Sequence, residues 1–345
     1  MRSLTAQKIL FGIIALSEED QIFDTIYREH VVHTRTSVPL MMDDLLESLR
    51  AAKKKLQVEE LIIMPSTEAL VRFVLENREA FSKENMKIPL VDKALYNQIS
   101  DKFSFSRLCQ EHGIKLPKEY KNIKETRFPF VAKPKTYFSK VSNHILAPII
   151  IYNQEQKEAF ISDYHDVDFY YQEFVEGKSR YLLYYFHSDK SVYKFSQENL
   201  VQQPGGKSIV AARSTDFHLS VESEKYENLF HKIGFTGFVM IEVIGDNYMI
   251  ESNPRLWGPS QLFVDAKAKL FEAFLHDQGF ISAKPSRETN TQKEVLYFWH
   301  GGIQATQEAN LELDYHNYDA QQLHDNYSRF MEVDVLGRGD VIEKG

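Results

Sequence analysis

The sequence predicts an α/β protein whose C-terminal part belongs to the α+β class, and three observations support this prediction. Short apolar runs alternate with helical patterns over residues 1–100, as in a small open α/β sheet. Short strands separated by turn residues dominate between residues 169 and 251, as in an antiparallel sheet. The chain has 345 residues, of which 43% are hydrophobic, so it can bury several cores. We therefore expect three regions, at 1–100, 101–187 and 188–345.

The N-terminal region contains two runs typical of buried parallel strands. In residues 8–15, an almost continuous apolar run follows Lys8. Residues 61–64 form a second apolar run, which ends at Pro65. Apolar side chains recur at helical spacing over 41–55 and again over 68–75. This order of strand, helix, strand and helix predicts the small α/β sheet.

The rest of the chain reads as helices and short strands punctuated by glycines. Gly113 and Gly234 each follow a helical pattern, as glycines at helix C-termini do. We expect helices at 102–112, 154–163, 222–233 and 262–275, and strands at 128–132, 169–175, 181–187, 192–195, 238–244, 248–251 and 294–299.

Composition excludes several classes of function. The formal net charge of −8 argues against bulk nucleic-acid binding, which needs a basic surface. No run of about 18 uncharged apolar residues occurs, so no membrane-spanning helix is expected. The single cysteine, Cys109, cannot form an intrachain disulfide, which favours a reducing compartment such as the cytoplasm. The 12 histidines show no zinc-binding spacing.

The most informative stretch is a predicted β-hairpin between residues 237 and 259. A two-residue turn at Asp246-Asn247 places Glu242 opposite Glu251 on one face of the hairpin. Opposed residues have Cβ atoms about 4.5–5.5 Å apart, and two like charges there are destabilising unless a positive group lies between them. The same turn predicts the further pairs Gly245 with Tyr248, Ile244 with Met249 and Val243 with Ile250.

Two further polar residues follow on the same face. Asn253 lies two positions beyond Glu251, and Arg255 keeps the same parity. Two carboxylates and an amide oxygen suit Mg²⁺, which takes its remaining ligands from water and phosphate oxygens, and an arginine can bind those oxygens. The hairpin therefore predicts a metal–nucleotide site. The alternative is an exposed polar face on a hairpin whose register differs by one residue.

These residues resemble a known family. The Glu242 strand followed by Glu251-Ser252-Asn253-Pro254-Arg255 is similar to the glutamate strand and Glu-x-Asn-x-Arg element of the ATP-grasp superfamily, especially its carbamoyl-phosphate-synthase-like ligases. The resemblance implies that Glu242, Glu251 and Asn253 hold Mg²⁺, or Mn²⁺ in its place, against ATP phosphates. It also implies that Arg255 contacts the transferred phosphoryl group or an acyl phosphate.

Three upstream stretches extend the resemblance in the same order. Ser100-Asp101-Lys102 looks like the family's entry to the ATP region, and 128–134 looks like its strand with a phosphate-binding lysine, Lys133. Tyr171-Gln172-Glu173-Phe174-Val175-Glu176-Gly177 looks like the hinge whose backbone binds adenine, which implies roles for Gln172, Glu173, Phe174 and Val175. Each stretch also has a plain alternative: Lys102 as a solvated helix residue, Lys133 as a strand-end cation, and the hinge as an ordinary strand.

Two features depart from the family pattern. The loop 134–143 contains no glycine, although the family's loop after the strand lysine is glycine-rich. Either side chains close this loop over phosphates or the loop 203–208, which contains Gly205 and Gly206, contributes. Lys178, Ser179 and Arg180 follow the hinge where an acidic ribose ligand is common, and Glu176 is a displaced candidate.

The resemblance implies an ATP-grasp fold with an N-terminal pre-ATP-grasp domain (1–100), a central lid region (101–187) and a C-terminal lobe with the metal-binding hairpin (188–345). It implies a ligase that phosphorylates a small-molecule carboxylate and then joins it to an amine, in which Lys133 and Arg255 are catalytic. The alternatives are a kinase acting on a hydroxyl, a nucleotide-binding protein without turnover, and a carbohydrate or peptide binder. A homodimer is the default oligomeric state.

Overall fold

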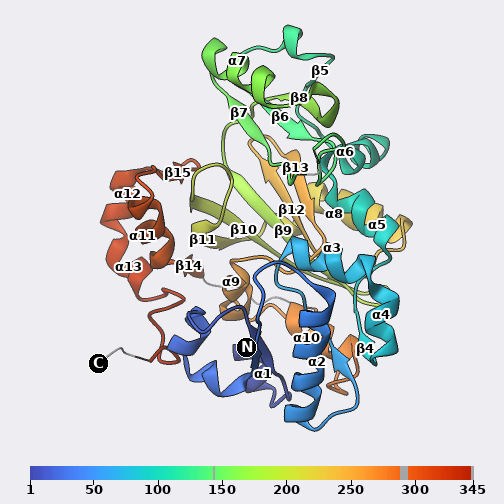
Figure 1. Ribbon diagram of the computed structural model, residues 1–345. Helices are drawn as coiled ribbons and strands as arrows, with labels where there is room; N and C mark the ends of the chain where they lie inside the picture. The colour runs from blue at the N-terminus through green and yellow to red at the C-terminus, as the bar shows by residue number, and fades with distance from the viewer. Residues whose placement is uncertain (143, 288–293, 343–345) are drawn as a thin grey trace.

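The computed structural model describes residues 1–142, 144–287 and 294–342. Its strands form four sheets: two parallel pairs near the N-terminus, a four-stranded antiparallel sheet and a seven-stranded antiparallel sheet. We call the four-stranded sheet the lid sheet and the seven-stranded sheet the central sheet. Figure 1 shows the lid sheet at the top, the central sheet in the middle and the N-terminal segment below.

The N-terminal segment packs helices against the two parallel strand pairs, β1 with β2 and β3 with β4. Both predicted strands are shorter than expected, since β1 begins only at Ile13 and β3 ends at Ile62. Instead of one open sheet, the segment has two separate pairs. Its elements are α1 (Arg2–Ala6), β1 (Ile13–Ala15), η1 (Gln21–Asp24), η2 (Ile26–His30), β2 (Val31–Thr34), α2 (Met42–Leu56), β3 (Leu61–Ile62), α3 (Glu68–Glu76), α4 (Arg78–Lys83), β4 (Met86–Lys87) and α5 (Lys93–Ser100).

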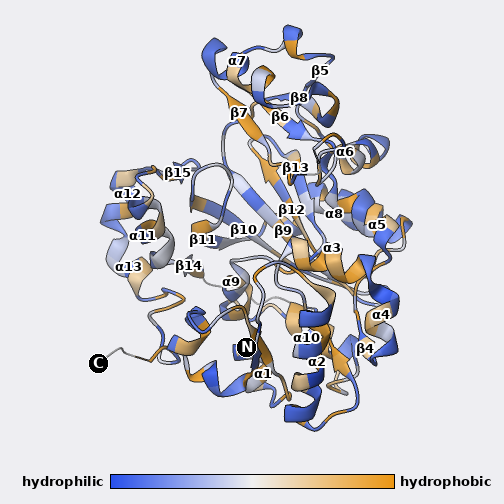
Figure 2. Ribbon diagram, viewed as in Figure 1, coloured by the Kyte–Doolittle hydropathy of each residue, from blue (hydrophilic) through white to orange (hydrophobic). Residues whose placement is uncertain are grey.

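Amphipathic spacing explains the helices of this segment. In α2, Leu45, Leu49 and Ala52 lie on one buried face, and Figure 2 shows this helix in bands of blue and orange. The helix α3 begins where the Thr67 hydroxyl accepts a hydrogen bond from the Leu70 amide, and Val71 is fully buried.

The lid sheet has the strand order β5-β8-β6-β7, with α7 packed on one face. Phe130, Phe169 and Tyr171 point toward Phe160 of α7. Because side chains alternate along a strand, Lys133, Tyr170 and Gln172 lie on the opposite face. The elements of this region are α6 (Lys102–Glu111), β5 (Glu119–Tyr120), η3 (Ile123–Glu125), β6 (Phe130–Pro134), β7 (Ile149–Ile151), α7 (Gln154–Asp163), η4 (Asp166–Asp168) and β8 (Phe169–Glu173).

The central sheet has the order β13-β12-β9-β10-β11-β14, with β15 paired to β10. Helices α9 and α10 cover one face, α6 and α8 cover the other, and α11–α13 pack beside β11 and β14. Its elements are β9 (Ser179–Phe186), β10 (Val192–Gln202), β11 (Ile209–Thr215), η5 (Phe217–Leu219), α8 (Val221–Lys232), β12 (Gly237–Ile244), β13 (Tyr248–Asn253), α9 (Ser260–Asp265), α10 (Leu270–Asp277), β14 (Leu296–Phe298), α11 (His300–Glu308), β15 (Asp314–Tyr315), α12 (Ala320–Asp325) and α13 (Tyr327–Met331).

Two predicted elements of this part were wrong in extent. The expected helix 262–275 is two helices, α9 and α10, because Lys267 adopts a left-handed conformation with φ of 58°. The expected strand 192–195 extends to Gln202 and pairs with β11, which the sequence reading missed. Among the described residues, no helix is long and apolar enough to cross a membrane.

Candidate active site

The two glutamates of the predicted hairpin face each other. Glu242 of β12 pairs with Glu251 of β13, as the sequence predicted, but the turn differs from the expected one. Three residues, Gly245-Asp246-Asn247, form it, so Val243 pairs with Met249 rather than with Ile250. A bulge between Glu242 and Val243 then restores the predicted pair.

Lys102 provides the positive charge that this pair requires. It is the first residue of α6, and its Nζ lies 2.5 Å from Glu251 Oε2. The Asn253 amide donates to Glu251 Oε1 at 2.8 Å. Burial alone would raise the pKa of Glu251, but the Lys102 ammonium and then the Asn253 amide outweigh burial and lower that pKa. Glu251 is therefore a fixed anion at neutral pH.

Glu242 has a different environment. It is 8% exposed, and its nearest donor is the hydroxyl of Ser179, which lies 2.9 Å from Oε1. Burial, and then the charge of Glu251, raise the pKa of Glu242. A divalent cation between the two carboxylates would relieve this repulsion.

Lys133 reaches the same place from the lid sheet. Its side chain is buried, and its Nζ donates to the Ile250 carbonyl of β13 at 2.9 Å. Burial, reinforced by the nearby charge of Lys102, lowers the pKa of Lys133 to about 7. The start of α6 and the lid sheet thus place Lys102 and Lys133 beside the two glutamates of the central sheet.

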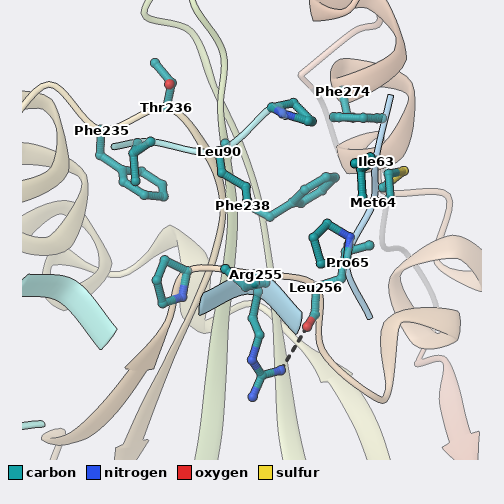
Figure 3. A pocket seen from close by; sticks show the side chains of 15 residues that line it. Ile63, Met64, Pro65, Leu90, Phe235, Thr236, Phe238, Arg255, Leu256 and Phe274 are labelled. Carbon is teal, nitrogen blue, oxygen red and sulfur yellow. Dashed lines mark hydrogen bonds between the residues drawn. The ribbon is translucent and has the colours of Figure 1, made fainter. Parts of the chain in front are cut away.

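Arg255 follows β13 and has no carboxylate partner among the described residues. Its Nη1 donates to the Leu256 carbonyl at 3.0 Å, and its Nε is buried without a partner in the described part of the chain. Figure 3 shows its guanidinium pointing away from Phe238 and Phe274, which line a small apolar cavity. That cavity, of about 30 Å³, is too small for a substrate.

The predicted hinge follows β8. Gln172 is 2% exposed, and its Oε1 has no hydrogen-bond partner among the described residues. The Glu173 backbone is already paired, since its N–H donates to the Lys118 carbonyl at 2.9 Å. In contrast, the peptide groups of Phe174 and Val175 form no hydrogen bonds within the described residues, so both remain available to a ligand.

The hinge backbone also touches the turn of the hairpin. The Gly245 N–H donates to the Lys178 carbonyl at 3.0 Å. A Cβ on Gly177 would lie 2.9 Å from the Gly245 Cα, and one on Gly245 would lie 2.6 Å from the Glu176 carbonyl oxygen. Both glycines have positive φ, at 124° and 58°. Glycine is therefore required on both sides of this contact.

Side chains, not glycines, organise the loop 134–143, of which Asn143 lies outside the described residues. Asp168, which is buried, accepts from the Ser139 hydroxyl at 2.6 Å and from the Lys140 amide at 2.9 Å. The ring of Tyr137 packs on the guanidinium of Arg72, with 4.6 Å between the ring centroid and Cζ. The loop 203–208 contacts a different part of the chain, since the Gly205 amide donates to the side chain of Asp314 in β15.

Arg72 and Glu68, on α3, are site residues that the sequence reading missed. Arg72 donates to Asp101 at 2.7 Å and to Glu68 at 2.9 Å, and Ser100 donates to Glu68. This cluster holds the start of α6, where Lys102 lies. A signal was present, because Thr67-Glu68 opens a helix just after the parallel strand β3, and α/β sheets often bind ligands beyond the carboxyl ends of their strands.

Comparison with known proteins decides the fold. No family model matches the sequence, and no curated protein matches it. Among solved structures, biotin carboxylase from Campylobacter jejuni, in a β-γ-ATP complex, has a TM-score of 0.61 at 16% identity, covering 84% of this chain and 69% of that one. The structure of N5-carboxyaminoimidazole ribonucleotide synthetase with ADP has a TM-score of 0.59 at 14% identity, covering 85% and 76%. The chain has the ATP-grasp fold.

A third ATP-grasp neighbour, from Hydrogenobacter thermophilus, is the biotin carboxylase domain dimer of 2-oxoglutarate carboxylase with MgADP, ADP and bicarbonate. It has a TM-score of 0.61 at 13% identity and covers 84% of this chain and 67% of that one. Similarities at these identities concern the fold, so the function must come from the residues of the site.

The donor groups gathered at this site fit a magnesium nucleotide. Glu242, Glu251 and Asn253 present oxygen ligands on one face, which suits Mg²⁺. Within the described residues, no group of three or more His, Cys, Asp or Glu side chains is arranged to hold a metal. Two carboxylates and an amide leave ligand positions that phosphate oxygens can fill.

Proposed function

We propose that this chain is an ATP-dependent ligase that joins a small-molecule carboxylate to an amine through an acyl phosphate, releasing ADP and phosphate. The observation that carries the proposal is the meeting of Glu242, Glu251, Lys102 and Lys133 between the lid sheet and the central sheet. An amino acid or short peptide is the substrate class that the family resemblance favours.

Each residue has a role in this proposal. Mg²⁺ or Mn²⁺ held by Glu242, Glu251 and Asn253 would neutralise charge on the phosphates. Lys102 and Lys133 hold phosphate oxygens, and Lys133 takes up a proton when a phosphate replaces the Ile250 carbonyl as its partner. This step couples nucleotide binding to the ionisation of a buried amine.

The two ends of the nucleotide meet different groups. The free peptide groups of Phe174 and Val175 pair with the adenine edge, and Gln172 Oε1 accepts from its amino group. At the other end, Arg255 offers unpaired N–H donors to the transferred phosphoryl group and to the acyl phosphate. Closure of the lid region excludes water from that intermediate.

The test is release of ADP from Mg²⁺-ATP in a screen of amino acids and short peptides, supplied singly and in pairs. A ligase requires both a carboxylate and an amine, whereas a kinase requires one acceptor. We expect Glu251→Ala and Asn253→Ala to abolish turnover. Asp246→Ala, in the exposed turn of the same hairpin, is the matched control and should keep it.

Other outcomes would overturn the proposal. ADP release with a single hydroxyl acceptor would indicate a kinase. Binding of Mg²⁺-ATP without turnover for any pair would indicate a nucleotide-binding protein. If Mg²⁺-ATP does not raise the melting temperature, the proposed nucleotide site is wrong, because a ligand at 100 times its Kd raises the free energy of unfolding by about 2.7 kcal/mol.

Compartment and assembly complete the proposal. The only cysteine, Cys109, is a free and buried thiol, which supports a reducing compartment such as the cytoplasm. One structural neighbour is described as a domain dimer, which supports a homodimer. Light scattering of the purified protein tests the dimer, and fractionation of the cells that make it tests the compartment.

A further inference from the structure

Behind Glu242, three polar side chains form a chain of hydrogen bonds inside the central sheet. The Ser179 hydroxyl of β9 donates to Glu242 Oε1 at 2.9 Å. The Asn199 amide of β10 donates to Ser179 Oγ at 2.8 Å, and the Gln197 amide donates to Asn199 Oδ1 at 2.8 Å. Ser179, Asn199 and Gln197 are each 0% exposed. We call these three residues the polar relay.

The strand register places the relay beside the carboxylate. Asn199 pairs with Ser179, and Tyr181, two residues further along β9, pairs with both Gln197 and Glu242. Further along the same face of β10, the side chains are Phe195 and Tyr193, which belong to the hydrophobic core. The face thus changes from apolar to polar only where it approaches Glu242.

The relay has a defined direction. The hydroxyl proton of Ser179 points to the carboxylate, so its oxygen is free to accept from Asn199. Asn199 in turn accepts from Gln197 through its carbonyl oxygen. Each donor therefore points toward Glu242. An aspartate at position 199 could not take part, because an ionised carboxylate donates no hydrogen bond.

The cost of the relay also needs a reason. A hydrogen bond inside a sheet gains little net stability, because apolar groups of the same shape could replace both partners. The relay costs more than that, because Gln197 Oε1 is buried without a hydrogen-bond partner among the described residues. The partner carboxylate shows the contrast, since Glu251 is held by the Lys102 ammonium. Glu242 forms no hydrogen bond or ion pair with a cation among the described residues, so neutral donors fix its position and leave its charge for a metal ion.

We propose that Ser179 and Asn199 are positioning residues that hold the Glu242 carboxylate in place to bind the divalent ion. The proposal rests on the proposed function, because it assumes that Glu242 binds Mg²⁺ with the nucleotide. Groups that orient metal ligands in this way typically change metal affinity 10–100-fold when they are removed. The relay therefore acts on the metal through Glu242 and does not touch the nucleotide.

The experiment measures Mn²⁺ binding by electron paramagnetic resonance with saturating ADP, for the wild type, Ser179→Ala and Asn199→Asp. We expect both variants to bind Mn²⁺ about 10–100-fold more weakly. Affinity for ADP without metal should stay unchanged, a separation that general damage to the fold would not produce. Ser252→Ala is the matched control, because Ser252 is also buried and its hydroxyl has no hydrogen-bond partner among the described residues.

The outcomes separate the two proposals. If the wild type binds Mn²⁺ with ADP and Ser179→Ala binds it equally well, the relay is overturned and the proposed function stands. Equal losses in Ser179→Ala and Ser252→Ala would also overturn the relay. If the wild type binds no Mn²⁺ with ADP, both proposals fail. Melting temperatures identify a variant that does not fold, and Ser179→Ala removes only one oxygen atom.

Discussion

Replacing Lys102 with methionine should destabilise the protein by leaving Glu251 without its cation. The Lys102 and Glu251 side chains are only 17% and 23% exposed, with 2.5 Å between Nζ and Oε2. Removing one partner of a buried ion pair typically costs about 3–5 kcal/mol, because the other charge stays buried and uncompensated. The entropy of unfolding is about 2.1 cal/mol/K per residue, or about 0.7 kcal/mol/K for 345 residues. Dividing the lost free energy by this entropy predicts that the melting temperature falls by about 4–7 °C.

Thermal unfolding of the metal-free protein near neutral pH measures this loss. In Lys102→Met the pKa of Glu251 should rise, so the loss applies above that pKa and shrinks as the pH falls through it and the carboxyl becomes neutral. The double variant Lys102→Met, Glu251→Gln should recover most of the stability, because no orphaned charge remains.

Lys115→Met is the matched control for Lys102→Met. Lys115 pairs with Asp246 in the turn of the same hairpin, where the two side chains are 41% and 83% exposed, so its loss should matter far less. A Lys102→Met protein that melts with the wild type, or a double variant no more stable than the single one, would refute the reasoning.

Three further predictions concern other parts of the site. The unfolded chain keeps the Lys133 proton up to about pH 10.5, whereas the folded chain releases it near pH 7. The free energy of unfolding of the wild type, measured relative to that of Lys133→Met, should therefore rise by about 2 kcal/mol between about pH 7 and 9. Urea titrations that show no such rise would contradict the lowered pKa of Lys133. Tyr137→Ala removes the ring from Arg72, a contact worth about 0.5–1 kcal/mol, so calorimetry should show ADP binding about 2–5-fold more weakly, while Tyr137→Phe should bind as the wild type does. In Gly245→Ala, a residue with a φ of 58° would carry a Cβ 2.6 Å from the Glu176 carbonyl oxygen. This variant should lower the melting temperature more than Gly205→Ala, where φ is also positive but the added Cβ meets no atom within 4 Å. Equal shifts in melting temperature would mean that the close approach at Gly245 costs nothing.

Local patterns predicted much of the site. The helix Gln154–Asp163 was predicted at its observed bounds. The Glu242–Glu251 pair was predicted from a two-residue turn; the observed three-residue turn and the bulge together give the same pair. These features depend on the period of a strand or helix, which neighbouring residues determine. The same local information missed the bulge, because an extra residue in a strand changes no hydrophobic pattern that a reader could count.

The remaining parts depend on contacts between distant segments. The position of Arg72 beside Tyr137 joins α3 to the loop 134–143, and the contact of Asp168 with Ser139 closes that loop. No periodicity in either segment identifies its partner. The polar relay also depends on distant segments. Asn199 on β10 is linked to Glu242 only because β9 places Ser179 between them.

The contact between Gly177 and Gly245 sets where an opening motion can pivot. Two peptide backbones meet there with no side chain between them, so the residues after β8 are held against the turn of the β12–β13 hairpin. If the lid sheet rotates about this point, Phe174 and Val175 travel least and Lys133 travels further. Under the proposed function, the base of a nucleotide would then dock while the sheets are apart, and Lys133 would reach its phosphates only as the sheets come together.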